Sequence, residues 1–293
     1  MRSGRIHATN IQCDKSHRYK KPMILDKIVE NKKREVEEHR KFYKELAEKV
    51  KNPPYPPFHK GGDVGDYLAP VRNFLSAISL PGKINLIAEI KKFSPSNPLP
   101  VKDFNPDIIA RVYESGGASA LSVLTDRDYF GGGFEVMASV KDKTEIPVLC
   151  KDFIIDELQI YAARHYGADA VLLIARILKD KEMKSFMTLA DSLGMNALVE
   201  VQSRQELDRV LKTEVRIIGI NNRNLDTLEV RLNTTLELIK FIPRDRVIVS
   251  ESGIKAREDV LKLKNAGVNA ILAGEALLRT SDIAAKIKEL LTD

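Results

Sequence analysis

Eight short apolar segments between residue 86 and the C-terminal region constrain the fold more than any other feature of this chain. Each is a nearly continuous run of apolar and often β-branched residues, which is the pattern of a strand buried on both faces. We therefore expect strands at 86–91, 120–124, 147–151, 170–174, 197–201, 217–221, 247–251 and 270–274.

Amphipathic segments separate these strands, and their apolar residues recur at helical spacing. They lie at 106–116, 156–166, 180–193, 203–211, 232–240 and 256–266. The weakest unit is 126–140, where we expect only a short helix behind a glycine-rich loop. Eight strand–helix units and no more favour an α/β fold of the closed (β/α)8 TIM-barrel type over an open doubly wound sheet.

The region before the barrel has three parts. Residues 1–22 form a basic, polar leader without an apolar centre, and we expect this leader to be disordered. The strongly amphipathic segment 24–50 predicts an extra N-terminal helix. The tract 52–66 is rich in proline and glycine and predicts an irregular surface insertion. Apart from the leader, 23–293 is expected to be a single barrel domain.

The distribution of charge argues against a nucleic-acid partner. The net charge is +6, but the leader holds six basic residues against Asp14 alone, which leaves only +1 for the rest of the chain. Aromatic stacking residues are almost absent from the leader, so we expect no nucleic-acid binding. The apolar runs are too short to cross a bilayer, so no membrane partner is expected. Cys13 lies in the leader and Cys150 in an apolar strand, which fits a cytoplasmic protein without a structural disulfide.

Polar side chains stand at the C-terminal ends of the expected strands, where a (β/α)8 barrel carries its active site. They comprise three carboxylates, two lysines and an amide: Glu89, Glu200, Glu251, Lys91, Lys151 and Asn221. Burying isolated charges costs several kcal/mol each, so a purely structural role for five charges at once is a weak explanation. We therefore expect an enzyme active site at this end of the barrel.

The residue types in this group predict acid–base chemistry without a metal or other cofactor, because no His, Cys or Asp cluster has metal-ligand spacing. A catalytic lysine among other cations and apolar walls is expected to have a lowered pKa. SESG at 250–253 and AGEAL at 273–277 follow the last two strands. Their glycines let backbone N–H groups approach an anion, so these loops predict a phosphate-binding site.

Six motifs, in order along the chain, resemble those of the indole-3-glycerol phosphate synthase family. They are IAEIKKFSPS (87–96), VLCKDFI (148–154), ALVEV (197–201), IGINNRNL (218–225), VSESGI (249–254) and AGEALLR (273–279). The resemblance covers about 23–291 apart from the insertion, and its first motif and KDF are quite specific. It implies a lyase of tryptophan biosynthesis that converts 1-(2-carboxyphenylamino)-1-deoxyribulose 5-phosphate to indole-3-glycerol phosphate, CO₂ and water.

The resemblance also implies roles for the charged residues. Lys151 would be the general acid that protonates the ketone oxygen during ring closure. Lys91 would bind the substrate carboxylate and supply acid in the dehydration. Glu200 would take part in proton transfer as the hydroxyl leaves, and Glu89 and Glu251 would orient the lysines and stabilise positive charge.

Further residues are assigned to binding by the same resemblance. Asn221 would hold the sugar hydroxyls and Arg223 the carboxylate side of the substrate. Phe93 and Phe153 are candidates for contact with the anthranilate ring or for simple packing. The phosphate would lie on Ser94, Gly253 and Gly274, with Ser252 near the substrate. The sequence departs from the family pattern at Asn97 and Pro98, and at Glu275, which stands where a small polar residue often helps to bind phosphate.

Two alternatives remain open at this stage. One is another sugar-phosphate barrel such as phosphoribosylanthranilate isomerase, whose chemistry typically relies on a Cys and Asp pair at strand ends. Cys150 precedes Lys151, so its side chain should point away from the site. The other alternative is a non-catalytic phosphate-binding barrel, which predicts loss of Lys151 or Glu200, although both are present. The expected partner is a small-molecule substrate, and the expected state is a monomer or weak oligomer.

Overall fold

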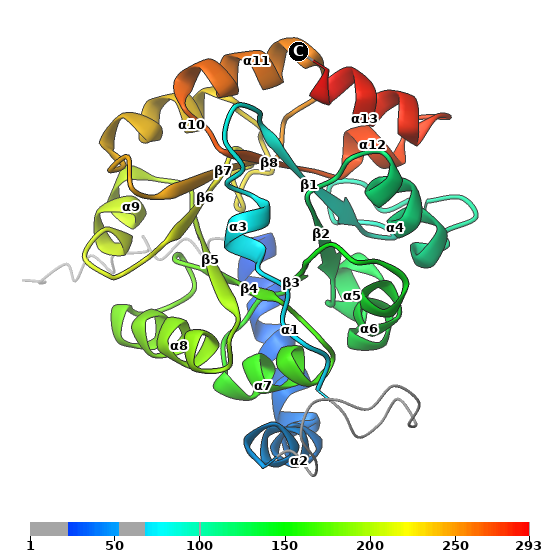
Figure 1. Ribbon diagram of the computed structural model, residues 1–293. Coiled ribbons are helices and arrows are strands. Elements are labelled where there is room, and N and C mark those ends of the chain that lie inside the picture. The colour runs from blue at the N-terminus through cyan, green and yellow to red at the C-terminus, as the bar shows by residue number, and fades with distance from the viewer. Residues whose placement is uncertain (1–22, 53–67, 100, 293) are drawn as a thin grey trace, which may run out of the picture.

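Eight parallel strands close into a barrel in the order of the sequence, with helices packed around the outside (Figure 1). This computed structural model describes residues 23–52, 68–99 and 101–292. The strands are β1 (Asn85–Ile90), β2 (Ala120–Leu124), β3 (Val148–Lys151), β4 (Ala170–Ile174), β5 (Asn196–Val201), β6 (Ile217–Asn221), β7 (Val247–Glu251) and β8 (Ala270–Ala273). The predicted (β/α)8 barrel is confirmed, and no strand differs from its predicted bounds by more than one residue at either end.

The helices follow the strands as predicted, with additional short helices. They are α1 (Ile24–Glu38), α2 (Arg40–Lys51), α3 (Phe74–Ala77), α4 (Pro106–Ser115), α5 (Arg127–Phe130), α6 (Phe134–Lys143), α7 (Glu157–His165), α8 (Asp180–Ser192), α9 (Arg204–Val210), α10 (Asn233–Leu238), the 3₁₀ turn η1 (Ile239–Phe241), α11 (Arg257–Ala266), α12 (Glu275–Leu278) and α13 (Ile283–Leu291).

The interior of the barrel is filled by apolar side chains and closed at both ends by helices. Leu149, Leu198 and other inward residues of the strands form one buried cluster with Phe74 and Ile78 of the α3 region and with α1. At the N-terminal end of the strands, the Asn85 amide donates to the carbonyl of Ile78 at 3.1 Å, which holds the α3 region against β1. The opposite end, where α1 lies, carries the charged residues.

The amphipathic segment 24–50 is two helices and not one, which corrects the sequence-based expectation. The break falls at His39, whose backbone leaves the helical region with φ −100° and ψ 8°. Its Nδ1 donates to the carbonyl of Glu35 at 2.9 Å and so terminates α1. The chain can then turn so that α2 packs against α7 through a buried cluster that includes Tyr43 and Leu158.

The glycine-rich loop after β2 lies between two short helices, α5 and α6, where one short helix was expected. Gly131 ends α5 in the left-handed region, with φ 64°. A Cβ atom on Gly132 would lie 1.9 Å from the carbonyl oxygen of Leu124. The loop backbone therefore lies directly against the end of β2, which only glycine permits here.

Two predicted segments stay predictions, because the leader 1–22 and nearly all of the insertion 52–66 lie outside the described residues. Asn52 is described, and it ends α2 with its backbone N–H donating to the carbonyl of Glu48 at 2.9 Å.

A buried ion pair holds the N-terminal end of the barrel together, opposite the charged mouth. Asp169, just before β4, is fully buried. Its Oδ1 accepts from Lys141 Nζ at 2.6 Å and from the Arg72 backbone N–H at 2.6 Å. Its Oδ2 accepts from the Val148 N–H at 2.7 Å. Burial lowers the pKa of Lys141 to about 8 although Asp169 raises it, so this pair is costly to bury and costly to break.

We expect Asp169→Asn to lower the free energy of unfolding by about 3–5 kcal/mol, because the ammonium of Lys141 loses its counter-charge in a buried place. Urea denaturation followed by circular dichroism measures this. The control is Asp142→Asn, since Asp142 is exposed on the same helix as Lys141. A loss below about 1 kcal/mol would mean that Lys141 and Asp169 contribute no more than an ordinary surface ion pair, and would contradict the expectation.

Candidate active site

A cavity opens at the C-terminal ends of the strands and includes about 1080 Å³ of space together with its mouth. The register of the strands brings their ends to one level, since Ile174 pairs with Glu200 and Asn221 with Glu251. Of the residues predicted from the sequence, the cavity is lined by Glu89, Lys91, Ser94, Lys151, Phe153, Glu200, Asn221, Arg223, Glu251, Ser252, Gly253 and Gly274.

Lys151, the last residue of β3, lies at the centre of this charged group. Its Nζ donates to Glu251 Oε2 at 2.7 Å and to Glu200 Oε2 at 3.1 Å. The Lys151 side chain is 12% exposed, and each of the two carboxylates is 2% exposed. The lysine can therefore reach the cavity while two buried carboxylates fix the position of its ammonium group.

The pKa of Lys151 is raised, and the expectation of a lowered value is wrong. Burial alone lowers it, because an ammonium group loses its hydration. The carboxylates of Glu251 and Glu200, and that of Glu89 further away, act in the opposite direction and prevail. The sequence analysis assumed that cations and apolar walls would surround the lysine, whereas the fold surrounds it with anions. Lys151 is consequently a protonated acid at neutral pH.

The carboxylate of Glu251 titrates near neutrality. Burial raises its pKa, Lys151 lowers it and Glu200 raises it again, with a net value of about 7. Among the described residues, Glu251 Oε1 and Glu200 Oε1 are buried without a hydrogen-bond partner, while each Oε2 atom binds Lys151. The cluster thus holds an ammonium group together with two carboxylate oxygens that bind no other described residue.

Lys91 and Glu89 form a second pair on the β1 side of the cavity, with Lys91 Nζ donating to Glu89 Oε1. The Lys91 side chain is 20% exposed and its partner 9%, so this lysine is the more accessible of the two active-site lysines. Burial raises the pKa of Glu89, but the attraction of Lys91 and Lys151 lowers it by more, so the net pKa is below the usual value. The two lysines therefore favour the anionic form of Glu89.

Two glycines leave the space that these carboxylates occupy. A Cβ atom on Gly219 of β6 would lie 2.2 Å from Glu251 Oε1, and one on Gly274 would lie 2.7 Å from Glu89 Oε1. Both distances are far inside van der Waals contact. The sequence predicts Gly274 only as a phosphate-binding glycine, and it does not single out Gly219.

Asn221, the last residue of β6, is joined by a hydrogen bond to Arg223, two residues further along the chain. Asn221 Oδ1 accepts from the Arg223 backbone N–H at 2.9 Å, which directs the amide NH₂ group of Asn221 away from that bond. The Arg223 guanidinium is 3.4 Å from Glu275 Oε2. The charge of Glu275, which departs from the family pattern, is therefore paired with a cation at the cavity wall.

The side of the cavity after β7 and β8 combines small residues with backbone of positive φ. Ser252 and Gly253 both adopt positive φ, at 66° and 80°, directly after β7. Gly274 precedes the first turn of α12. Ser94 is buried, and its Oγ lies 3.2 Å from Ser96 Oγ. These features agree with the expected phosphate side of the site.

The opposite wall is apolar, and part of it was missed by the sequence analysis. Phe153 lines the cavity, with Phe130 beside it at a ring-centroid distance of 6.0 Å. Phe93 is not among the lining residues, because its ring packs against Gly131 instead. The remaining apolar lining comes largely from α1 and the strands: Ile24, Leu25, Ile28, Leu124, Leu172, Ile174 and Leu272. The helical spacing of the three α1 residues was visible in the sequence, but nothing there indicated which surface they cover.

Among the described residues, no group of three or more His, Cys, Asp or Glu side chains is placed to hold a metal ion. No helix in the described part of the chain is long and apolar enough to span a membrane.

The closed barrel and the lysine–glutamate cluster at its mouth define a (β/α)8-barrel enzyme with an acid–base site. The model of the indole-3-glycerol phosphate synthase family matches residues 25–290. Indole-3-glycerol phosphate synthases of Alkaliphilus metalliredigens and Acetivibrio thermocellus are each 44% identical to the chain; the matches cover 92% and 91% of it and 98% of each relative. The chain belongs to the indole-3-glycerol phosphate synthase family, a family of carboxy-lyases in tryptophan biosynthesis. This confirms the resemblance of the motifs.

Solved structures with low sequence identity share the fold alone. A 3-hexulose-6-phosphate synthase from Salmonella typhimurium superposes with a TM-score of 0.58 at 12% identity, covering 71% of this chain and 96% of that one. A thiamine phosphate pyrophosphorylase from Pyrococcus furiosus gives 0.55 at 15% identity, covering 74% and 96%.

We expect Gly219→Ala to lower kcat/KM at least about tenfold and the free energy of unfolding by about 1–3 kcal/mol, because the added methyl group displaces the Glu251 carboxylate. Steady-state kinetics and urea denaturation measure the two effects. Because Glu251→Ala by itself takes a partner from Lys151, Gly219→Ala is also compared in a Glu251→Ala background, where it should cost less stability than in the wild type because the clash with the carboxylate is gone. Wild-type kinetics in Gly219→Ala would contradict the conclusion that Gly219 leaves room for the Glu251 carboxylate.

The raised pKa of Glu251 predicts a dependence of stability on pH. Because this pKa rises from 4.5 to about 7 on folding, the folded state takes up a proton between these values. The carboxyl's contribution to stability is thus complete below about pH 4.5 and declines as the pH rises through 7. We expect the unfolding free energy of the wild type, relative to Glu251→Gln, to fall from about pH 5 to about pH 8 in urea denaturation. Parallel curves for the two proteins would show that Glu251 has an ordinary pKa.

Proposed function

We propose that this protein catalyses the synthase reaction itself, closing the indole ring of 1-(2-carboxyphenylamino)-1-deoxyribulose 5-phosphate with release of CO₂ and water. The observation that carries the proposal is the position of Lys151, a protonated lysine held at the cavity between Glu200 and Glu251 at 3.1 and 2.7 Å. A fixed acid beside two carboxylates suits a reaction that must both donate and remove protons.

Lys151 is the general acid of ring closure in this proposal. The aromatic carbon that bears the carboxylate attacks the ketone carbon, and the ketone oxygen takes a proton from the Lys151 ammonium as it becomes a hydroxyl. The raised pKa keeps Lys151 in the acid form at neutral pH. Buried carboxylates next to it stabilise the positive charge that ring closure builds on the aniline system.

Lys91 and Glu200 act in the steps that follow. Loss of CO₂ restores the aromatic ring, after which the new hydroxyl leaves as water with a proton from Lys91. Glu200 removes the proton from the carbon next to nitrogen, which completes the indole double bond. Glu200 Oε1 is available for this, because only Oε2 binds Lys151. Glu89 holds Lys91 in place through their ion pair.

The two walls of the cavity suit the two ends of the substrate. The apolar wall, with Phe153 and the α1 residues, provides the surface for the anthranilate ring. The backbone near Gly253 and Gly274, together with Ser94, provides the phosphate site. Asn221 holds the sugar hydroxyls. Arg223 holds the substrate carboxylate, which competes with Glu275 for the guanidinium group.

We further propose that the enzyme works in the cytoplasm as a monomer or weak oligomer. In support, Cys150 is a free, buried thiol, and burial raises its pKa to about 12, which keeps it unreactive.

The test is the appearance of indole fluorescence when purified protein meets the substrate. The chain has no tryptophan, so the background is quiet. We expect the wild type to give the signal and Lys151→Ala to lose about 10²- to 10⁴-fold in rate, the usual contribution of a general acid. Lys102→Ala, which changes an exposed lysine, is the control. A folded wild type that gives no signal would reject the synthase activity in favour of sugar-phosphate binding alone.

A further inference from the structure

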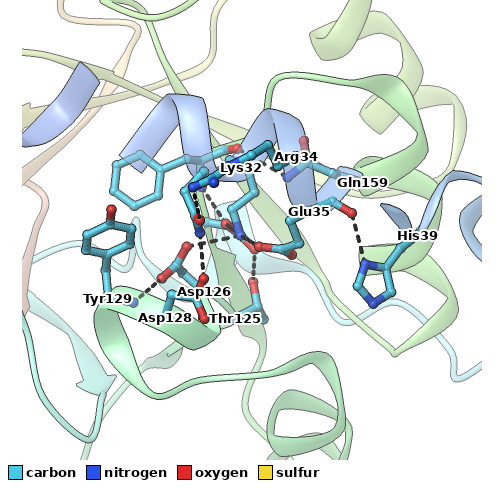
Figure 2. A network of polar contacts seen from close by, with 12 residues as sticks. Lys32, Arg34, Glu35, His39, Thr125, Asp126, Asp128, Tyr129 and Gln159 are labelled. Atoms are coloured by element: carbon cyan, nitrogen blue, oxygen red, sulfur yellow. Dashed lines mark hydrogen bonds and ion pairs between the residues drawn. The ribbon is translucent and has the colours of Figure 1, made fainter. Parts of the chain in front are cut away.

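A second buried lysine, Lys32 of α1, lies behind the active site and has no place in the reaction described above. It is completely buried. Its Nζ lies 2.7 Å from Glu35 Oε2, 3.0 Å from Asp152 Oδ1 and 3.1 Å from Asp126 Oδ2. Figure 2 shows Lys32 reaching from α1 toward Asp126 and Glu35, with Thr125 beside them.

The Lys32 network joins three elements that are far apart in the sequence. Asp126 follows β2 and caps α5, with its Oδ1 accepting from the Tyr129 N–H at 2.8 Å. Asp152 follows β3 directly and is next to Lys151. Burial alone lowers the pKa of Lys32, but Asp152 and Asp126 raise it more, so the lysine is a full cation here. A buried cation with these partners is a rigid connection between α1 and the ends of β2 and β3.

Asp152 also helps to position its two neighbours in the chain, Lys151 and Phe153, which line the cavity. Its Oδ1 accepts from the Phe153 N–H at 2.7 Å, and its Oδ2 accepts from Thr125 Oγ1 at 2.6 Å. The Thr125 N–H in turn donates to the Lys151 carbonyl at 3.1 Å. Lys32 thus holds the middle of the segment Lys151–Asp152–Phe153, whose outer members supply the acid and an aromatic wall.

The same lysine fixes the helix that closes the apolar side of the cavity. Leu25 and Ile28 line the cavity and lie seven and four residues before Lys32, on the same face of α1. Their own apolar contacts set the depth of the helix but do not fix its rotation or its position along its axis. Ion pairs from one buried ammonium group to carboxylates after β2 and β3, at 3.1 and 3.0 Å, restrict both.

We propose that Lys32 is a positioning residue for the synthase reaction, which holds α1 and the Lys151–Phe153 segment in the arrangement that binds substrate. This rests on the proposed function. Lys32 does not line the cavity. It acts through Asp152 and through α1.

The test compares Lys32→Met, which keeps the length and removes the charge, with Lys33→Met, the exposed neighbour on the same helix. Kinetics are measured at about 25 °C, where folded protein can be verified by circular dichroism. We expect Lys32→Met to lower kcat/KM at least about tenfold, with KM raised as well as kcat lowered. Lys33→Met should stay within about twofold of the wild type. A role in stability alone would lower the melting temperature and leave the kinetics of the folded protein unchanged.

Hydrogen–deuterium exchange gives a readout that does not depend on activity. We expect faster amide exchange in Lys32→Met at both 24–38 and 151–155, relative to Lys33→Met, because both segments lose their connection. Unchanged exchange together with wild-type kinetics would overturn the proposal.

A second variant covers the case in which Lys32→Met folds poorly. Lys32→Met/Asp126→Asn removes one unpaired carboxylate and keeps an oxygen at position 126 to cap α5. We expect it to fold better and to keep the low kcat/KM, because Asp152 still lacks its partner. Recovery of kcat/KM would mean that Lys32 only balances charge, and would overturn the positioning role. A wild type that turns over no substrate would instead reject the proposed function, with exchange still deciding whether Lys32 makes the connection.

Discussion

The pairing of buried charge at the ends of the strands is the constraint on which the rest of this site depends. Lys151, Glu200 and Glu251 are nearly buried, and an isolated charge there would cost several kcal/mol. Each is held only because the others lie within hydrogen-bond distance. Gly219 leaves the space for the carboxylate of Glu251, and Gly274 leaves the space for that of Glu89. The same pairing keeps the lysine protonated and brings the pKa of Glu251 to about 7, so the arrangement that makes burial tolerable also provides the acid–base groups.

The chain after β3 connects this cluster to a second one. Lys151 lines the cavity with its ammonium group between two carboxylates, and the carboxylate of Asp152, the next residue, lies 3.0 Å from Lys32 of α1. Two buried lysines thus share one short piece of backbone. Because α1 also supplies Leu25 and Ile28 to the cavity wall, the N-terminal helix belongs to the active site although it lies outside the barrel.

Much of the barrel, and the charged residues that meet at the cavity, followed from pattern alone. Strands buried on both faces are visible as continuous apolar runs, and a charged residue that ends such a run, like Lys151 or Glu251, stands out against it. Breaks within helical segments were harder to predict. His39 ends α1 through a ring contact with the carbonyl of Glu35, and no proline or glycine marks that position. Phe93 was selected because of its motif, yet its ring lies on Gly131, since side-chain direction in a loop depends on packing.

The sequence by itself determined the class of fold, the positions of the strands and the set of charged residues at their ends, because periodicity and isolated charges are local properties. Tertiary structure decided which charges meet. The expected lowered pKa of a catalytic lysine presupposed cations and apolar walls around it, whereas three carboxylates from β1, β5 and β7 raise the pKa of Lys151. Nothing in the sequence distinguishes Lys32 from the other lysines of segment 24–50, and only the fold places Asp126 and Asp152 around it. Electrostatic energy depends on distances in space, and residues far apart in the chain set those distances only when the barrel closes.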